Sequence, residues 1–249
     1  MAIIGSQDVQ IGNSNFVSTP APATYDLGTR GYTKDGRAFR YVQAGAVALV
    51  AGEVIQSPAV VAGSLARAVN TTSGVAQAAT VISVTCGSSV AAGFYNDGFL
   101  MIASGAGQGL QYQIRNHPAV STGATGAFTL YDEDALTVAI TTTSTVSLFQ
   151  NKYSNVIQMP VTTATGVAVG VATYPIAVTQ FGWIQTWGPC PVKGDDTTAI
   201  GAPLNAVAAT AGRASGFTAA GLLTGQILGY LMQAAVQAQW VEVDLRIAP

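Results

Sequence analysis

Charge is what this chain lacks most. Of its 249 residues only 9% are Asp, Glu, Lys or Arg, whereas about 25% is usual in soluble domains. Apolar residues make up 49%, and the mean hydropathy is +0.38. A lone soluble monomer rarely carries so little charge, so the composition favours a chain that buries surface against other chains. We therefore expect a homo-oligomer, with a trimer as the first expectation.

Long hydrophobic runs and an excess of basic residues are also missing. The longest uncharged stretch, residues 153–192, is interrupted by Pro160, Pro175, glycines and threonines, so no membrane-spanning helix is predicted. A formal net charge of -2 leaves no basic field for nucleic acid. The start, residues 1–6, lacks the pattern of a secretory signal, which predicts synthesis in a cytoplasm. We expect neither a membrane nor a nucleic acid as partner.

Residues that usually carry catalysis or bind metals are few. The single histidine, His117, is predicted to lie in a loop and has no partner at triad or metal-site spacing. Cys86 and Cys190 form no metal motif and are predicted to be buried, reduced thiols. Asp195 and Asp196 are adjacent and would point to opposite faces of a strand, which makes them a poor acid–base pair. The sequence predicts no enzyme, no cofactor and no metal site.

Strand patterns are abundant. Residues 81–86 and 241–247 alternate between apolar and polar or small side chains, as half-buried strands do. The glycine cluster at residues 105–109 precedes a strand pattern without lysine, which predicts a tight turn and not a phosphate loop. Residues 222–236 fit a helical face, but Gly225 and Gly229 weaken a helix. For this region we favour a strand over residues 226–233, paired with the terminal strand, and keep the helix as the alternative.

These patterns predict an all-β fold, a β-sandwich or β-barrel body with an extended N-terminal arm. Residues 1–24 show no sustained period, and residues 1–29 are predicted to form the arm, either disordered or ordered on a neighbouring subunit. Residues 30–249 then form the β-rich body. Two β subdomains divided near residue 150 are a further possibility within it.

Two tryptophans mark the stretch that the body is expected to be built around. If residues 181–188 are extended, Phe181, Trp183, Gln185 and Trp187 lie on one face. Prolines bound this stretch, with Pro175 before it and Pro189 and Pro191 after it, as expected for a strand that ends in turns. The aromatic face is either part of the core or a ridge that meets a partner chain.

The only basic cluster lies around one turn. Arg30, Lys34, Arg37 and Arg40 surround a single Asp35, and the Asp-Gly pair that follows Lys34 predicts a hairpin turn. The turn is either a solvated turn or a contact with an acidic partner surface. Our candidate interface residues are therefore Arg30, Lys34, Arg37, Arg40, Trp183 and Trp187.

Several fragments resemble a known class of proteins. Residues 35–41 (DGRAFRY), 105–112 (GAGQGLQY), 182–188 (GWIQTWG) and the terminal strand together resemble structural proteins of tailed-bacteriophage virions, especially capsid decoration or cement proteins. The resemblance implies an all-β, non-enzymatic subunit, often trimeric, on the outer face of a phage head. It also implies the major capsid protein as partner and the capsid surface as location.

Three alternatives stay open at this point. A phage tail or baseplate component would have a similar composition and would assemble into rings or tubes. A carbohydrate-binding β-sandwich module would need Trp183 and Trp187 exposed as sugar platforms. A polysaccharide-degrading enzyme would need a pair of carboxylates in a cleft, which the sequence does not visibly supply.

Overall fold

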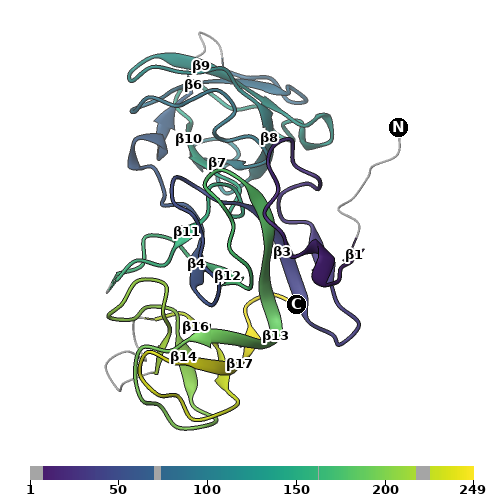
Figure 1. Cartoon of the computed structure of the whole chain (residues 1–249). Helices are drawn as coiled ribbons and strands as arrows, with labels where there is room; N and C mark the ends of the chain where they lie inside the picture. The colour runs from purple at the N-terminus through teal and green to yellow at the C-terminus, as the bar shows by residue number, and fades with distance from the viewer. Residues whose placement is uncertain (1–7, 70–73, 162, 217–224) are drawn as a thin grey trace. The chain divides into compact units, whose positions relative to one another are not determined.

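A computed structural model describes residues 8–69, 74–161, 163–216 and 225–249, and its regular secondary structure is almost entirely strand (Figure 1). Within these residues the only helical elements are three short 3-10 turns: η1 (Asn13–Asn15), η2 (Ala62–Ser64) and η3 (Asp132–Asp134). The predicted all-β class is confirmed. No helix in the described part of the chain has the length and hydrophobicity to cross a membrane.

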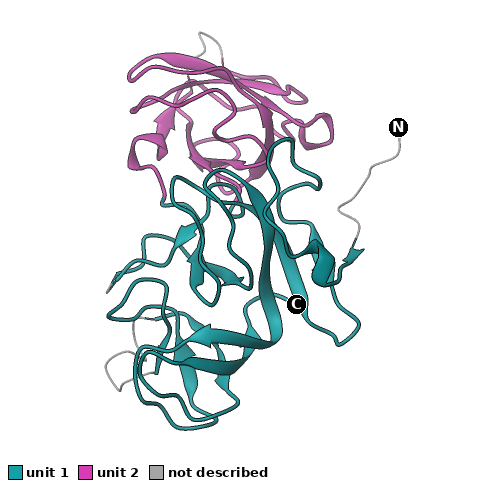
Figure 2. Cartoon of the chain, in the orientation of Figure 1, with its two compact units in different colours: residues 1–59, 152–249 teal, residues 60–151 magenta. Residues whose placement is uncertain are grey.

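The chain forms two compact units (Figure 2). Unit 1 comprises residues 1–59 and 152–249, and unit 2 comprises residues 60–151. Unit 2 is thus inserted into unit 1, because the chain leaves unit 1 after Ala59 and re-enters it at Lys152. The contacts therefore divide the chain at two places, one of which lies near residue 150, and they do not separate residues 1–29 from the body.

Unit 2 is a nearly closed barrel. Its sheet has the order β5-β10-β7-β8-β9-β6, and a bridge between Val69 and Val84 links its two ends. The strands are β5 (Arg67–Ala68), β6 (Val81–Thr85), β7 (Phe99–Ser104), β8 (Gln111–Asn116), β9 (Thr125–Leu130) and β10 (Thr145–Phe149).

Alternating side chains fill this barrel, because successive residues of a strand point to opposite faces. Ile82 and Val84 of β6 are fully buried, and Cys86 continues the same parity. The predicted alternation of residues 81–86 is therefore confirmed. Four further strands, β7 to β10, contribute equivalent buried pairs: Leu100 and Ile102, Tyr112 and Ile114, Phe128 and Leu130, Val146 and Leu148.

Unit 1 is organised by one large sheet. Its main path is β1-β2-β3-β13-β17-β16-β14-β15, while β12 pairs with both β13 and β4, and β11 pairs with β4. The strands are β1 (Val9–Gln10), β2 (Arg30–Tyr32), β3 (Ala38–Gln43), β4 (Val54–Gln56), β11 (Ile157–Gln158), β12 (Ala168–Ala172), β13 (Phe181–Lys193), β14 (Pro203–Asn205), β15 (Ser215–Gly216), β16 (Ile227–Leu231) and β17 (Trp240–Arg246).

The long strand β13 connects the two halves of this sheet. Its first half pairs with β3 and β12, and residues 181–186 are all buried. Strands buried on both faces carry no charge, which explains the uncharged sequence here. Its second half pairs with β17 from Trp187 to Lys193, so Pro189 and Pro191 lie inside the strand. The prediction that these prolines end the strand was wrong, because a ladder tolerates proline where the missing N–H would point away from the partner strand.

The C-terminal hairpin has the predicted form. β16 pairs antiparallel with β17, with Leu231 opposite Val243. In β17 the side chains of Val241, Val243 and Leu245 are buried, so the predicted half-buried terminal strand is confirmed. The strand interpretation of residues 226–233 is confirmed for Ile227–Leu231, while residues 217–224 lie outside the described part.

The predicted N-terminal arm is not confirmed. Residues 1–7 lie outside the described part, but residues 8–29 pack on unit 1 itself. β1 pairs in parallel with β2, Ile11 is buried, and Thr19 exchanges two backbone hydrogen bonds of 2.8 and 2.9 Å with Phe181. The sequence did not predict this packing, because a few aromatic contacts can hold an irregular segment that has no repeating hydrophobic pattern.

Candidate functional site

Two of the four basic residues predicted at the turn are paired with acidic neighbours in their own chain. The Arg30 guanidinium lies 2.6 Å from the Asp8 carboxylate, and the Arg37 guanidinium lies 2.9 Å from the Asp35 carboxylate. Asp35 also accepts a hydrogen bond from the Thr33 hydroxyl. That bond, with Arg37 nearby, holds the pKa of Asp35 below its ordinary value.

The other two basic residues differ from each other. Arg40 is half-buried and donates to the carbonyl oxygens of Gly28 and Pro249, both at 3.2 Å. Lys34 is exposed and has no ion-pair or hydrogen-bond partner among the described residues. Within the part of the chain that the structure describes, the predicted cluster therefore presents one free cation, and the remaining charges stabilise the turn and the end of the chain.

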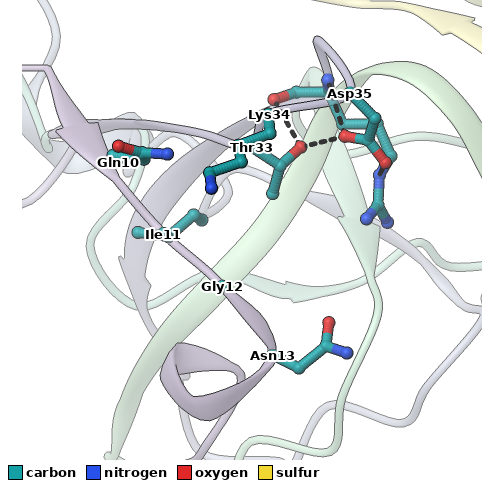
Figure 3. Close-up of a pocket in the computed structure, with 8 residues that line it drawn as sticks. Gln10, Ile11, Gly12, Asn13, Thr33, Lys34 and Asp35 are labelled. Carbon is teal, nitrogen blue, oxygen red and sulfur yellow. Dashed lines mark hydrogen bonds and ion pairs between the residues drawn. The ribbon is translucent and has the colours of Figure 1, made fainter.

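A pocket of about 510 Å³ lies beside this turn (Figure 3). Thr33, Lys34, Asp35 and Arg37 form one wall, and residues 10–13 of the N-terminal segment form the other. The pocket is open and exposes both polar and apolar side chains. It places the free Lys34 ammonium beside a surface built by the segment that was predicted to be an arm.

The aromatic face of β13 is part of the core. Trp183 is 3% exposed and packs against Tyr25 and Tyr41, with ring centroids 5.3 and 5.1 Å away. Trp187 is half-buried. Of the two interpretations of the aromatic face, the core interpretation describes Trp183, and neither tryptophan provides a fully exposed platform.

Gln185 explains how β13 changes partners. The side chain is fully buried, and its amide nitrogen donates to the carbonyl oxygens of Trp187, Gly188 and Pro189 at 3.0, 3.3 and 2.7 Å. These carbonyls follow a bulge in the β3–β13 pairing, and Gly188 adopts a positive φ of 81°. Because buried carbonyls need donors, Gln185 stabilises the backbone where β13 leaves β3 and joins β17.

His117 is a buried structural residue of unit 2. It follows β8 in a loop, as predicted, but its side chain is only 2% exposed. Its Nε2 accepts a hydrogen bond of 2.9 Å from the backbone N–H of Tyr95, and its Nδ1 lies 2.8 Å from the carbonyl oxygen of Pro118. Both contacts suit a neutral ring, and burial lowers the pKa of His117.

The adjacent aspartates hold a loop of unit 1. Asp195 accepts a hydrogen bond from the backbone N–H of Thr210 and lies 3.7 Å from the Arg213 guanidinium. Asp196 accepts from the backbone N–H of Gly216 at 3.0 Å. Among the described residues no group of three or more His, Cys, Asp or Glu side chains is placed to hold a metal ion.

Comparisons with other proteins do not assign this fold. No family model, curated protein or solved structure matches the chain. Its function must therefore be argued from its own surfaces.

One exposed surface was missed by the sequence analysis. In β17 the outward side chains are Trp240, Glu242, Asp244 and Arg246, and Trp240 is 51% exposed. The signal was available in the alternation of this strand. The sequence analysis used this alternation only to identify the buried side chains, because half-buried strands commonly have a polar outer face.

Proposed function

We propose that this chain is a structural protein of a tailed-bacteriophage virion that binds the outer face of the capsid and stabilises it. Its partner would be the major capsid protein, and its form on the capsid a homo-oligomer, with a trimer as the first expectation. The fragment resemblance and the all-β fold support this proposal. The observation that carries it is an apolar tip of unit 1.

The apolar tip is defined by five side chains that are 44–58% exposed: Val17, Val47, Val50, Tyr174 and Val178. Two loops form it, joined by a bridge between Leu49 and Ile176 with backbone hydrogen bonds of 2.8 and 3.1 Å. The N-terminal segment adjoins them, because the Ser18 hydroxyl accepts from the backbone N–H of Ala177 at 2.9 Å.

The chemistry of the tip suits a protein surface as its partner. Neither loop carries a charged residue between positions 41 and 52 or between 173 and 180. Covering apolar surface contributes roughly 25 cal/mol per Å², and an exposed group of apolar side chains is typical of an interaction site. A capsid lattice would cover such a tip without having to supply counter-charges.

Heating particles with and without the protein tests the function. We expect decorated particles to rupture at a higher temperature than undecorated ones. The tip variant Val47→Asp/Val178→Asp should stay folded and fail to bind, because binding would bury two unpaired carboxylates. The matched control Val138→Asp, at a position 44% exposed in unit 2, should bind normally. Equal rupture temperatures with and without bound protein would contradict a stabilising role.

The alternative functions make different predictions. A tail or baseplate component would be present in a handful of copies per particle, whereas a decoration protein would be present in hundreds, which mass spectrometry of purified particles distinguishes. A sugar-binding module built on Trp183 and Trp187 would need both rings exposed. The burial of Trp183 counts against that arrangement.

A further inference from the structure

In the sheet of unit 1, the outward surface of the second half of β13, β17 and β16 is rich in large side chains. We call it the outer face and define it by residues of the neighbouring strands β13, β17 and β16 and by Met232, which directly follows β16: Pro189, Pro191, Tyr230, Met232, Trp240, Glu242, Asp244 and Arg246. Backbone pairing places them in rows, because Asp244 lies opposite both Pro189 and Tyr230, and Glu242 lies opposite Pro191. Tyr230, Met232 and Trp240 are 41–51% exposed.

This composition favours a protein as the partner of the outer face. Tyrosine, tryptophan, methionine and arginine are enriched at protein interfaces. A sugar platform would use the two aromatic rings but would leave Met232 and the two prolines without a role. Arg246 forms two hydrogen bonds of 2.9 and 3.0 Å with Asp244 and stacks on Tyr230. These two charges already neutralise each other, so a neutral surface can cover them.

One carboxylate on the outer face is left without a cation. Glu242 is half-buried and lines a pocket of about 260 Å³ with Asp35, Arg37, Pro189 and Pro191. Arg37 lines the same pocket, but its ion pair is with Asp35. Within the described residues the Glu242 carboxylate has no ion pair or side-chain hydrogen bond. The pocket is therefore complementary to a positive side chain from outside.

The same turn carries a free cation on its other side. Asp35 and Arg37 line both pockets, whereas Lys34 lines only the larger one, with residues 10–13, and Glu242 only the smaller one. Lys34 and Glu242 form no ion pair with each other within one chain. A surface with an unpaired cation on one side and an unpaired anion on the other is complementary to a second copy of itself.

We infer that a second copy of this chain docks on the outer face, with Lys34 of one copy entering the pocket beside Glu242 of the next. For the trimer expected here the contact is head-to-tail, because a two-fold contact, which would pair Lys34 and Glu242 reciprocally, gives a dimer. A head-to-tail contact closes into a ring when the rotation between copies closes and forms a filament when it does not. The inference rests on the proposed homo-oligomer and names its interface. It needs no capsid, so it can be tested separately from capsid binding.

The size of the outer face is compatible with such a contact. At about 4.8 Å between strands and 3.4 Å per residue, three strands of six residues span roughly 300 Å². The turn and its two pockets extend this area on one side. Over both copies the sheet accounts for roughly 600 Å², about half of the 1,200 Å² at which specific interfaces begin, so the contact must also include the turn and its two pockets.

A charge-swap experiment tests the inference in the full-length protein. Sedimentation velocity should show an oligomer for the natural protein. Lys34→Glu and Glu242→Lys should each raise the dissociation constant about tenfold or more, because each places like charges together. The double variant Lys34→Glu/Glu242→Lys should restore it to within about threefold, because the pair is reversed and intact. Asp26→Lys and Arg115→Glu change exposed charges outside the proposed contact and should have no effect.

Several results would overturn the inference. They are a monomer at roughly 100 μM, single variants that associate like the natural protein, or a double variant that stays dissociated. If Glu242→Lys does not fold, Glu242→Gln should still weaken association by removing one charge of the pair. A monomer whose tryptophan fluorescence changes with a soluble glucan would assign the outer face to sugar binding instead. A monomer that still binds capsids would refute this interface and leave the proposed function standing.

Discussion

Tyr25 provides the sharpest test of how the N-terminal segment is held. Its half-buried ring contacts Tyr41 in an edge-on arrangement at 5.3 Å and Trp183 in a tilted one at 5.3 Å. Tyr25→Ala would remove both contacts and leave a cavity over the core. Folding of unit 1 should therefore depend on this residue, although it lies in a segment with almost no regular structure.

The expected loss can be worked from these contacts. Each aromatic pair contributes about 0.5–1.5 kcal/mol beyond its buried area, and truncating a fully buried aromatic residue costs about 3–5 kcal/mol. Because Tyr25 is only half-buried, we expect the free energy of unfolding to fall by about 2–4 kcal/mol. In a unit of this size that lowers Tm by roughly 5–15 °C.

Urea and thermal unfolding, followed by tryptophan fluorescence, measure this loss. Tyr174→Ala is the matched control, because Tyr174 belongs to the same unit but is 47% exposed; it should change stability by no more than about 0.5 kcal/mol. If Tyr25→Ala were as stable as this control, residues 8–29 would not be packed in solution. The N-terminal segment would then be an arm after all.

Two further predictions concern buried titratable groups. Burial lowers the pKa of His117 from 6.5, so the stability contributed by the neutral ring is complete above about pH 6.5 and is lost as the pH falls through the lowered pKa. Acid should therefore destabilise unit 2, and His117→Gln should flatten the pH dependence of the urea midpoint of unit 2 between pH 8 and 5. An unchanged pH dependence in this variant would contradict the prediction. Cys86 and Cys190 are unpaired and buried, and burial raises the pKa of both thiols. A thiol reagent at pH 8 should therefore modify both cysteines only after the protein is unfolded. Rapid labelling of the native protein, or the absence of free thiols after unfolding, would refute this prediction.

Strand alternation predicted the parts of the fold where one face of a strand is buried. Ile82 and Val84 of β6 and Val241 and Val243 of β17 are buried as their parity indicated, because the pleat fixes which side chains share a face. The glycine cluster at residues 105–109 is a turn between β7 and β8, with positive φ at Gly105, Gly107 and Gly109. Local chemistry decides such features, so a single sequence reveals them.

Long-range pairing was not visible in the sequence. Nothing local shows that Thr19 pairs with Phe181, or that residues 60–151 form a separate barrel inserted into the sequence of unit 1. Pro189 and Pro191 were interpreted by their usual role as strand ends, but the structure continues the strand through them. Whether proline ends a strand depends on which edge carries the partner, and that is a property of the folded sheet.

The ion pairs of the candidate site were likewise not predictable from the sequence. The sequence located the basic turn, but it did not show that Arg30 and Arg37 find carboxylates within their own chain while Lys34 does not. A salt bridge satisfied within the chain has little left to offer a partner, and an exposed one contributes only about 0–1 kcal/mol to stability. The functional value of this surface therefore depends on the charges left unpaired, Lys34 and Glu242. In the proposed contact between copies, these two groups would orient the neighbouring copy, because charge complementarity governs orientation more than affinity.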